Sequence, residues 1–272
     1  MKTYKKLFYK HDKERFEEYL EKVKSGKSTI AAGALLPHEI ISSLEDGTEP
    51  EVAELQWKRM VEDLAKKGKL RNCMAICDVS GSMMGTPMEV SVALGLSISE
   101  LSEEPWKDKL ITFSNYRQFH EIRGDSLSSK TSFIREMDWN LHTDFQKVFD
   151  RILEVAVRGS LGGEQMIKTS FVFSDMEFYL ASTSRNWETD YQVIQRKFGE
   201  KGFRKVPQIV FWNLRNSKAM PVPSNQEGVA LLSGFSKNLV TLFLEGDGIL
   251  TPDAVMQQAI SGEEYQKLVV ID

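Results

Sequence analysis

The pattern of hydrophobic and polar residues changes near residue 70. Before that point, apolar residues recur every three or four positions, which is the spacing of an amphipathic helix. This spacing predicts helices over residues 13–24, 37–44 and 51–64. The sequence Lys-Lys-Gly-Lys at 66–69 ends the third helix, because lysines favour the last turn and glycine the position after it. We therefore expect residues 1–70 to form a helical extension that packs on the rest of the chain.

From residue 71 onward, short apolar runs alternate with helical patterns. The apolar runs predict six strands, over 73–77, 109–113, 118–122, 169–174, 208–213 and 239–244. Helices are expected over 87–101, 144–158, 190–201 and 251–260. The two strands around Ser114 are joined by too few residues for a crossover, so this pair should be antiparallel. The alternation predicts an α/β domain over 71–272, with a mostly parallel six-stranded sheet covered by helices on both faces.

The predicted helix at 87–101 carries a start signal. Thr86 suits the N-cap position, Pro87 suits the first helical position, and Glu89 completes a capping box with Thr86. Because Thr86 is expected to be the N-cap of this helix, the residues between the strand 73–77 and Thr86 are expected to form a loop.

Composition and charge exclude several classes of function. Of the 272 residues, 41% are hydrophobic and 27% are charged, as in ordinary globular proteins. Asp and Glu outnumber Lys and Arg by 39 to 35, which gives a net charge of −4. Nucleic-acid binders usually carry a basic excess, so we expect no direct nucleic-acid binding. The uncharged apolar stretches are too short to span a bilayer and the N-terminus lacks the apolar core of a signal peptide, so we expect no membrane association.

Two cysteines indicate the compartment. Cys73 and Cys77 lie four residues apart in a predicted strand, which places them about 13 Å apart on one face, beyond the reach of a disulfide. Both thiols are therefore expected to be free, which favours an intracellular protein. The cytoplasm is the first expectation and the nucleus stays open.

Polar residues follow the predicted strands at the edge where ligands of open α/β sheets bind. Asp78, Ser80 and Ser82 follow the strand 73–77, and Asp175 follows the strand 169–174. Thr143 lies ahead of the predicted helix at 144–158. Carboxylates and hydroxyls are hard oxygen ligands, which suit magnesium, manganese or calcium rather than zinc or copper.

These residues resemble the metal-ion-dependent adhesion site of the von Willebrand factor A domain. In that family, two serines and a threonine bind the ion directly or through water, and two aspartates bind mainly through water. The resemblance covers about residues 70 to 245 and implies a metal site made of Asp78, Ser80, Ser82, Thr143 and Asp175. It also implies that the ion, with magnesium the first choice, keeps one coordination position open for the Asp or Glu of a partner protein.

This chain departs from the family pattern at two places. Many members have a glycine after the third-segment aspartate, where this chain has Met176 and Glu177. Many also have a glycine soon after the threonine, where this chain has Asp144 and Phe145. The extra carboxylates of Asp144 and Glu177 leave three roles open: they strengthen divalent binding, weaken the acceptance of an acidic partner, or only cap and solvate the loops.

A narrower resemblance extends over more of the chain. The segments 30–38, 173–177 and 228–236 are similar to the C-terminal half of a plant family related to the TROVE/Ro ring proteins. Those proteins carry an A-type domain after a ring of helical repeats. The resemblance implies that this chain is a fragment without the repeats, and that a ribonucleoprotein is a further candidate partner through the missing portion.

Three functions follow, of which a metal-dependent protein-interaction module is preferred. The second is a scaffold for RNA or ribonucleoprotein binding, which rests on the Ro-like resemblance alone. The third is a metal-dependent phosphoesterase, disfavoured because Ser80 stands where an aspartyl phosphatase needs its general acid. Neither Ser80 nor Ser82 has the flanking glycines of a hydrolase elbow, and 159–163 lacks the Lys-Ser/Thr of a phosphate loop. We therefore expect no enzyme activity.

Overall fold

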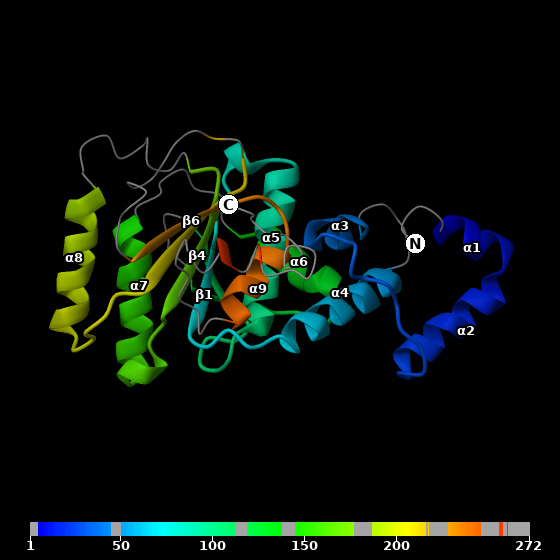
Figure 1. Ribbon diagram of the computed structural model, residues 1–272, viewed down its shortest axis with the longest axis horizontal. Coiled ribbons are helices and arrows are strands. Elements are labelled where there is room, and N and C mark those ends of the chain that lie inside the picture. The colour runs from blue at the N-terminus through cyan, green and yellow to red at the C-terminus, as the bar shows by residue number, and fades with distance from the viewer. Residues whose placement is uncertain are drawn as a thin grey trace, which may run out of the picture.

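The computed structural model describes residues 5–44, 50–112, 119–137, 145–176, 187–215, 217, 228–245, 256–257 and 260. Its centre is a six-stranded sheet with the order β3-β2-β1-β4-β5-β6 (Figure 1). The strands are β1 (Cys73–Cys77), β2 (Lys109–Thr112), β3 (Phe119–Glu121), β4 (Thr169–Ser174), β5 (Gln208–Asn213) and β6 (Val229–Ser233). Neighbouring strands run parallel except β2 and β3, which are antiparallel as predicted. The predicted fold class is confirmed.

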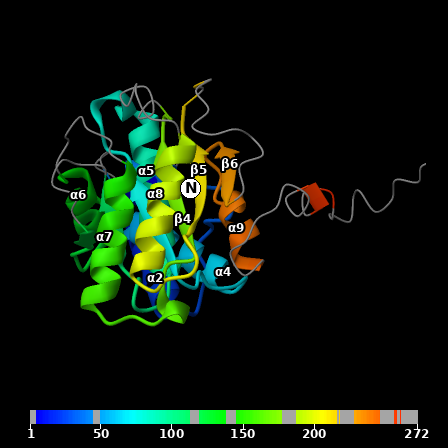
Figure 2. The same ribbon diagram turned by 90° about the vertical axis from the view of Figure 1, so that its left-hand side faces the viewer.

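Helices cover both faces of this sheet. The described helices are α1 (Lys5–His11), α2 (Lys13–Lys24), α3 (Pro37–Ser42), α4 (Pro50–Ala65), α5 (Thr86–Leu101), α6 (Leu127–Arg135), α7 (Phe145–Arg158), α8 (Trp187–Glu200) and α9 (Asn238–Glu245). Figure 2 shows α7 and α8 in front of the sheet, on the face opposite to α4 and α9. Among these described helices, none combines the length and the apolar character that crossing a bilayer requires.

Side chains at alternate positions of the strands pack into two separate hydrophobic cores, one on each face of the sheet. Ala75, Phe171 and Trp212 point to the face covered by α3, α4, α5, α6 and α9. Ile76 and Val172 point to the face covered by α7 and α8. Because both faces are buried, β1 and β4 are apolar along their whole length.

The N-terminal helices differ in how closely they join the sheet. Residues of α3 and α4, such as Ile41 and Trp57, belong to the same core as α5. In contrast, α1 and α2 lie farthest from the sheet (Figure 1) and pack in a small separate cluster around Phe16 and Leu20. The helical extension is therefore anchored through α3 and α4 to the helices α5 and α6, which cover the sheet.

The prediction for the sixth strand was wrong. Residues 239–244 were expected to form a strand, but they lie in α9, and the strand at the sheet edge is β6. Val240, Phe243 and Leu244 are buried on one side of α9, at the spacing of a helix. A short run rich in Leu and Phe fits both structures, and the packing against the sheet decides between them.

The start of α5 also differs from the prediction. Thr86 lies inside the helix, and the N-cap is Gly85, which has φ 89° and makes no side-chain cap hydrogen bond. Glu89 pairs with Arg135 of α6 instead of closing a capping box. Pro87 lies in the first turn, as proline prefers.

Other boundaries shift slightly or lie outside the described residues. The helix expected to start at residue 190 begins at Trp187, and α1 and α6 were not predicted. Of the helix predicted over 251–260, the structure describes only residues 256, 257 and 260.

Candidate cation site at the carboxyl edge of the sheet

The candidate site lies where the order of the strands reverses. The chain passes from β1 to β2 on one side of β1, and β4 lies on its other side. The register pairs Cys77 with Phe173, so the residues after both strands emerge next to each other. Ligands of α/β sheets bind at such a position, because the loops after the two strands diverge there and leave space between them.

Asp78 is held in place by hydrogen bonds to strand β4 and to the loop that follows Asp78. Its backbone N–H donates to the carbonyl of Phe173 at 2.9 Å, which continues the pairing of β1 with β4. One carboxylate oxygen accepts from the backbone N–H of Ser80 at 2.9 Å, and the other from the hydroxyl of Ser174 at 2.8 Å. The residue is only 4% exposed, so its carboxylate has one fixed orientation at the bottom of the loop.

Ser80 and Ser82 lie above this carboxylate, toward solvent. Their hydroxyl oxygens are 3.0 Å apart, and this spacing is set by the short 3₁₀ turn Gly81–Met83, which has Ser80 at its N-cap and contains Ser82. Met83 is fully buried and anchors the turn, whereas Met84 is 68% exposed. Two hydroxyl oxygens therefore face each other at the surface with a buried carboxylate behind them.

Asp175 emerges from β4 at the same edge and is 1% exposed. The next residue, Met176, has φ 67°, a left-handed conformation that costs a non-glycine residue about 1–2 kcal/mol. Its backbone N–H donates to the Ser174 hydroxyl at 3.1 Å, and its side chain is buried in the core beneath α7 and α8. Glycine adopts this conformation without strain, which is consistent with the glycine that many von Willebrand factor A domains have after this aspartate. In this chain, burial of the Met176 side chain offsets the strain.

The electrostatics at this edge favour a cation. Burial raises the pKa of the Asp78 carboxyl above its usual value, and the negative charge of Asp175 raises it further. Hydrogen bonds from Ser80 and Ser174 oppose this shift by stabilising the ionised form. A bound cation would remove the remaining penalty for two carboxylates held close together with little water.

The structure brings together four of the five predicted ligands. Asp78, Ser80, Ser82 and Asp175 lie at one edge of the sheet on the loops after β1 and β4. Thr143 lies outside the described residues, as do Asp144 and Glu177.

These four residues offer oxygen ligands only, which fit a hard divalent ion. Within the described ranges, no three His, Cys, Asp or Glu side chains gather in a metal-binding group. The four described residues contribute just two carboxylates, so hydroxyl oxygens would complete the coordination.

Ser174 is a residue of the candidate site that the sequence did not predict. Its hydroxyl donates to Asp78 and accepts from the backbone of Met176, so it joins the two loops of the site. The signal was a polar residue at the end of an otherwise apolar strand, next to a candidate ligand.

Comparisons with known proteins agree with this architecture. The Deinococcus radiodurans Ro (RSR) protein has a similar fold, with a TM-score of 0.55 and 16% sequence identity over 87% of this chain and 49% of that chain. Its likeness supports a von Willebrand A-like or Rossmann-like fold.

Sequence comparison finds a longer relative. "Uncharacterized protein L728" of Acanthamoeba polyphaga mimivirus is 34% identical over 235 residues, which are 85% of this chain and 41% of the mimivirus protein. The matched part is thus less than half of the mimivirus protein and about half of the Ro (RSR) chain. A family model described as Domain of unknown function (DUF2828) matches residues 1–70, and one described as Domain of unknown function (DUF7788) matches residues 72–269. Because this second match covers most of the chain, the protein belongs to the DUF7788 family.

Proposed function

We propose that this chain is a metal-dependent protein-interaction module. A divalent ion at the carboxyl edge of the sheet would bind the Asp or Glu carboxylate of a partner protein. The observation that carries the proposal is the buried Asp78 carboxylate, close to the buried Asp175 and behind two hydroxyl oxygens 3.0 Å apart.

Each residue has a distinct role in this proposal. Ser80 and Ser82 present hydroxyl oxygens to the ion, and Thr143 is the further hydroxyl ligand that the resemblance implies. Asp78 and Asp175 balance the charge of the ion from behind and orient its water ligands. Ser174 and the backbone of Ser80 hold the Asp78 carboxylate in one orientation, so little reorganisation is needed on binding.

The choice of ligands explains why a partner carboxylate would be accepted. The ligands bound directly would be mostly neutral hydroxyls, while Asp78 and Asp175 would act mainly through water, so the ion would stay electrophilic toward an external carboxylate. Magnesium is the first candidate, and manganese and calcium have the same preference for oxygen. The module is proposed to be non-catalytic, because Ser80 occupies the position where an aspartyl phosphatase needs a carboxylic acid.

Thermal unfolding with and without ions tests this proposal. The wild type would be unfolded in chelator and then with magnesium, manganese or calcium, next to Asp78→Ala and the control Asp63→Ala. Asp63 is a partly exposed carboxylate that pairs with Arg59 and Lys66, away from the site. A tenfold excess of ion over Kd stabilises the native state by about 1.4 kcal/mol, which raises Tm by roughly 3–6 °C for a domain of this size.

We expect this rise for the wild type and Asp63→Ala, and its loss in Asp78→Ala. No rise with any of the three ions, or an equal rise in Asp78→Ala, would refute the metal site. A crystal grown with magnesium would then test the open position, since a carboxylate from acetate or a neighbouring molecule should complete the coordination. Coordination by protein oxygens alone would contradict an adhesion function.

A second candidate function is favoured by the fold of the Ro (RSR) protein. In this reading, a longer protein holds RNA outside this chain, and this chain serves the assembly of a ribonucleoprotein. Retention of RNA on filters at two salt concentrations separates the candidates. Retention of RNA by this chain that falls with salt would favour RNA binding. Turnover of a phosphoester with magnesium would favour a metal-dependent phosphoesterase instead.

Two free and buried cysteines support a location inside the cell, where thiols stay reduced. We propose the cytoplasm or the nucleus as the compartment.

A further inference from the structure

The helix α5 follows directly after the proposed ion-binding loop and is almost entirely buried. Thr86 begins the helix four residues after Ser82. Its middle lies directly on β1, because a Cβ atom at Gly95 would come within 2.3 Å of the Cys77 sulfur. The position of the Ser80–Ser82 loop therefore depends on how α5 is held against the sheet.

Two ion pairs join α5 to α6, one at each end of α5. Near the site, Glu89 pairs with Arg135 at 2.5 Å. At the far end, Glu100 pairs with the Lys130 ammonium at 2.6 Å. All four side chains are partly buried, with 16–27% of their side-chain surface exposed, so these pairs are less screened by water than pairs on an open surface.

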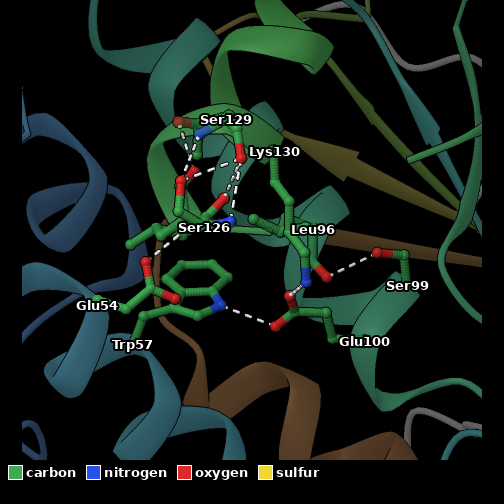
Figure 3. A network of polar contacts seen from close by, with 10 residues as sticks. Glu54, Trp57, Leu96, Ser99, Glu100, Ser126, Ser129 and Lys130 are labelled. Carbon is green, nitrogen blue, oxygen red and sulfur yellow. Dashed lines mark hydrogen bonds and ion pairs between the residues drawn. The ribbon is translucent and has the colours of Figure 1, made fainter. Parts of the chain in front are cut away.

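The helix α4 of the N-terminal region contacts both members of this helix pair (Figure 3). The indole N–H of Trp57 donates to the second carboxylate oxygen of Glu100 at 2.8 Å. The Glu54 carboxylate accepts from the backbone N–H of Leu127 at 2.6 Å, which satisfies a free donor in the first turn of α6. We call Glu54, Trp57, Glu100 and Lys130 the α4 clamp.

We propose that the α4 clamp positions the Ser80–Ser82 loop, so that the affinity of the site for a divalent ion depends on the N-terminal helices. This inference rests on the proposed metal-dependent function. Both carboxylate oxygens of Glu100 are in use, one by Trp57 and one by Lys130. Removing either donor leaves a poorly solvated acceptor at the end of α5, and the helix can relieve this cost by shifting relative to α6.

Ion binding must stabilise the clamp in return. If the clamp raises the affinity for the ion, thermodynamic linkage requires the ion to favour the clamped arrangement by the same factor. The backbone N–H of Leu127 reports this directly, since its hydrogen bond to Glu54 crosses from α4 to α6. Its hydrogen exchange should slow when magnesium saturates the site.

The test uses the full chain with single substitutions. Trp57→Phe keeps a buried, though smaller, aromatic ring and removes the N–H donor, and Lys130→Met keeps the aliphatic stem and removes the charge. Arg59→Met is the matched control, because it breaks the Arg59–Asp63 pair on α4 and leaves the clamp intact. The Kd for magnesium would be measured by calorimetry, and Tm by thermal unfolding in chelator.

We expect at least a threefold increase in Kd for Trp57→Phe and Lys130→Met and no change for Arg59→Met. We also expect magnesium to slow the exchange of the Leu127 amide. If the clamp variants lower Tm but bind magnesium as the wild type does, the clamp is only structural and the inference is overturned. If the wild type binds no divalent ion, the proposed function fails and this inference fails with it.

Discussion

At the scale of single residues, Asp78 shows how burial and hydrogen bonding oppose each other. Burial favours its neutral form, whereas hydrogen bonds from Ser80 and Ser174 favour the carboxylate. The outcome is a pKa above the usual value of 3.8. The native state without an ion therefore holds its proton more tightly than the unfolded chain does.

This shift predicts how stability depends on pH in the absence of ions. Because the native pKa of Asp78 is raised, its contribution to the unfolding free energy is most favourable below pH 3.8 and is lost as pH rises through the native pKa. Asp78→Asn stays neutral and removes this dependence. Denaturant unfolding in chelator across this range should show the wild type losing stability relative to Asp78→Asn as pH rises. A constant difference would contradict the prediction.

The two cysteines should be unreactive in the native protein. Burial raises the pKa of both Cys73 and Cys77 to about 12, so almost no thiolate is present near neutral pH. Labelling with a thiol reagent should be slow for the folded chain and rapid in denaturant. Rapid labelling of both thiols under native conditions would place this strand at the surface instead of at the centre of the sheet.

At the scale of elements, Lys237 links two segments that are far apart in the sequence. Its ammonium group donates to the carbonyl of Gly33 at 2.8 Å, and also to the carbonyls of Ala32 and Leu35. Beside it, the rings of His38 and Phe235 pack edge to face at 5.6 Å. The segment 30–38 is therefore held by Lys237 and by Phe235, which lies in the segment 228–236; both segments are part of the Ro-like resemblance.

Substitution of Lys237 should lower stability measurably. Lys237→Met keeps much of the side-chain packing but leaves carbonyls of the loop before α3 without their donor. The cost should be about 1–3 kcal/mol of unfolding free energy. Lys205→Met is the control, since Lys205 lies on the surface. Equal stabilities of the two variants in denaturant unfolding would show that water replaces the ammonium without cost.

At the scale of the whole molecule, the two family models meet near residue 70, but contacts cross this boundary. Leu70 exchanges backbone hydrogen bonds with Leu101 and Glu103, and residues of α3 and α4 belong to the core that α5 forms on the sheet. The division into a helical extension over 1–70 and a domain over 71–272 stays a prediction about folding units. The shared core argues that α3 and α4 unfold together with the sheet.

Native-state hydrogen exchange tests this coupling. Amides of α4 should exchange with the same unfolding free energy as those of β4, because opening α4 would expose the shared core. Amides of α1 and α2 should exchange through smaller, local openings, because their cluster is small and separate. If amides of α4 exchange while amides of β4 remain protected, the N-terminal helices form an independent folding unit.

Local patterns in the sequence were sufficient for much of the fold and for the placement of four candidate site residues. The bounds of α2, β1, β4 and β5 were predicted correctly, because their apolar spacing or continuous burial is encoded within each segment. The sequence also predicted that Asp78, Ser80, Ser82 and Asp175 lie at the carboxyl edge of the sheet, and the structure places them on the loops after β1 and β4. Each of these residues follows a strong apolar strand, and parallel strands bring their carboxyl ends to one edge.

Tertiary structure decided what local patterns leave open. A run such as 239–244 indicates burial but not the partner that buries it, so only packing against the sheet makes it a helix and leaves β6 as the edge strand. The helix α6 has few apolar residues, and its first turn is completed by Glu54, which lies 73 positions away in the sequence. Hydrogen bonds from Ser174 to Asp78 and from Trp57 to Glu100 likewise join segments that are distant in the sequence. Periodicity encodes which face of an element is buried, whereas the pairing of buried polar groups depends on which elements meet in space.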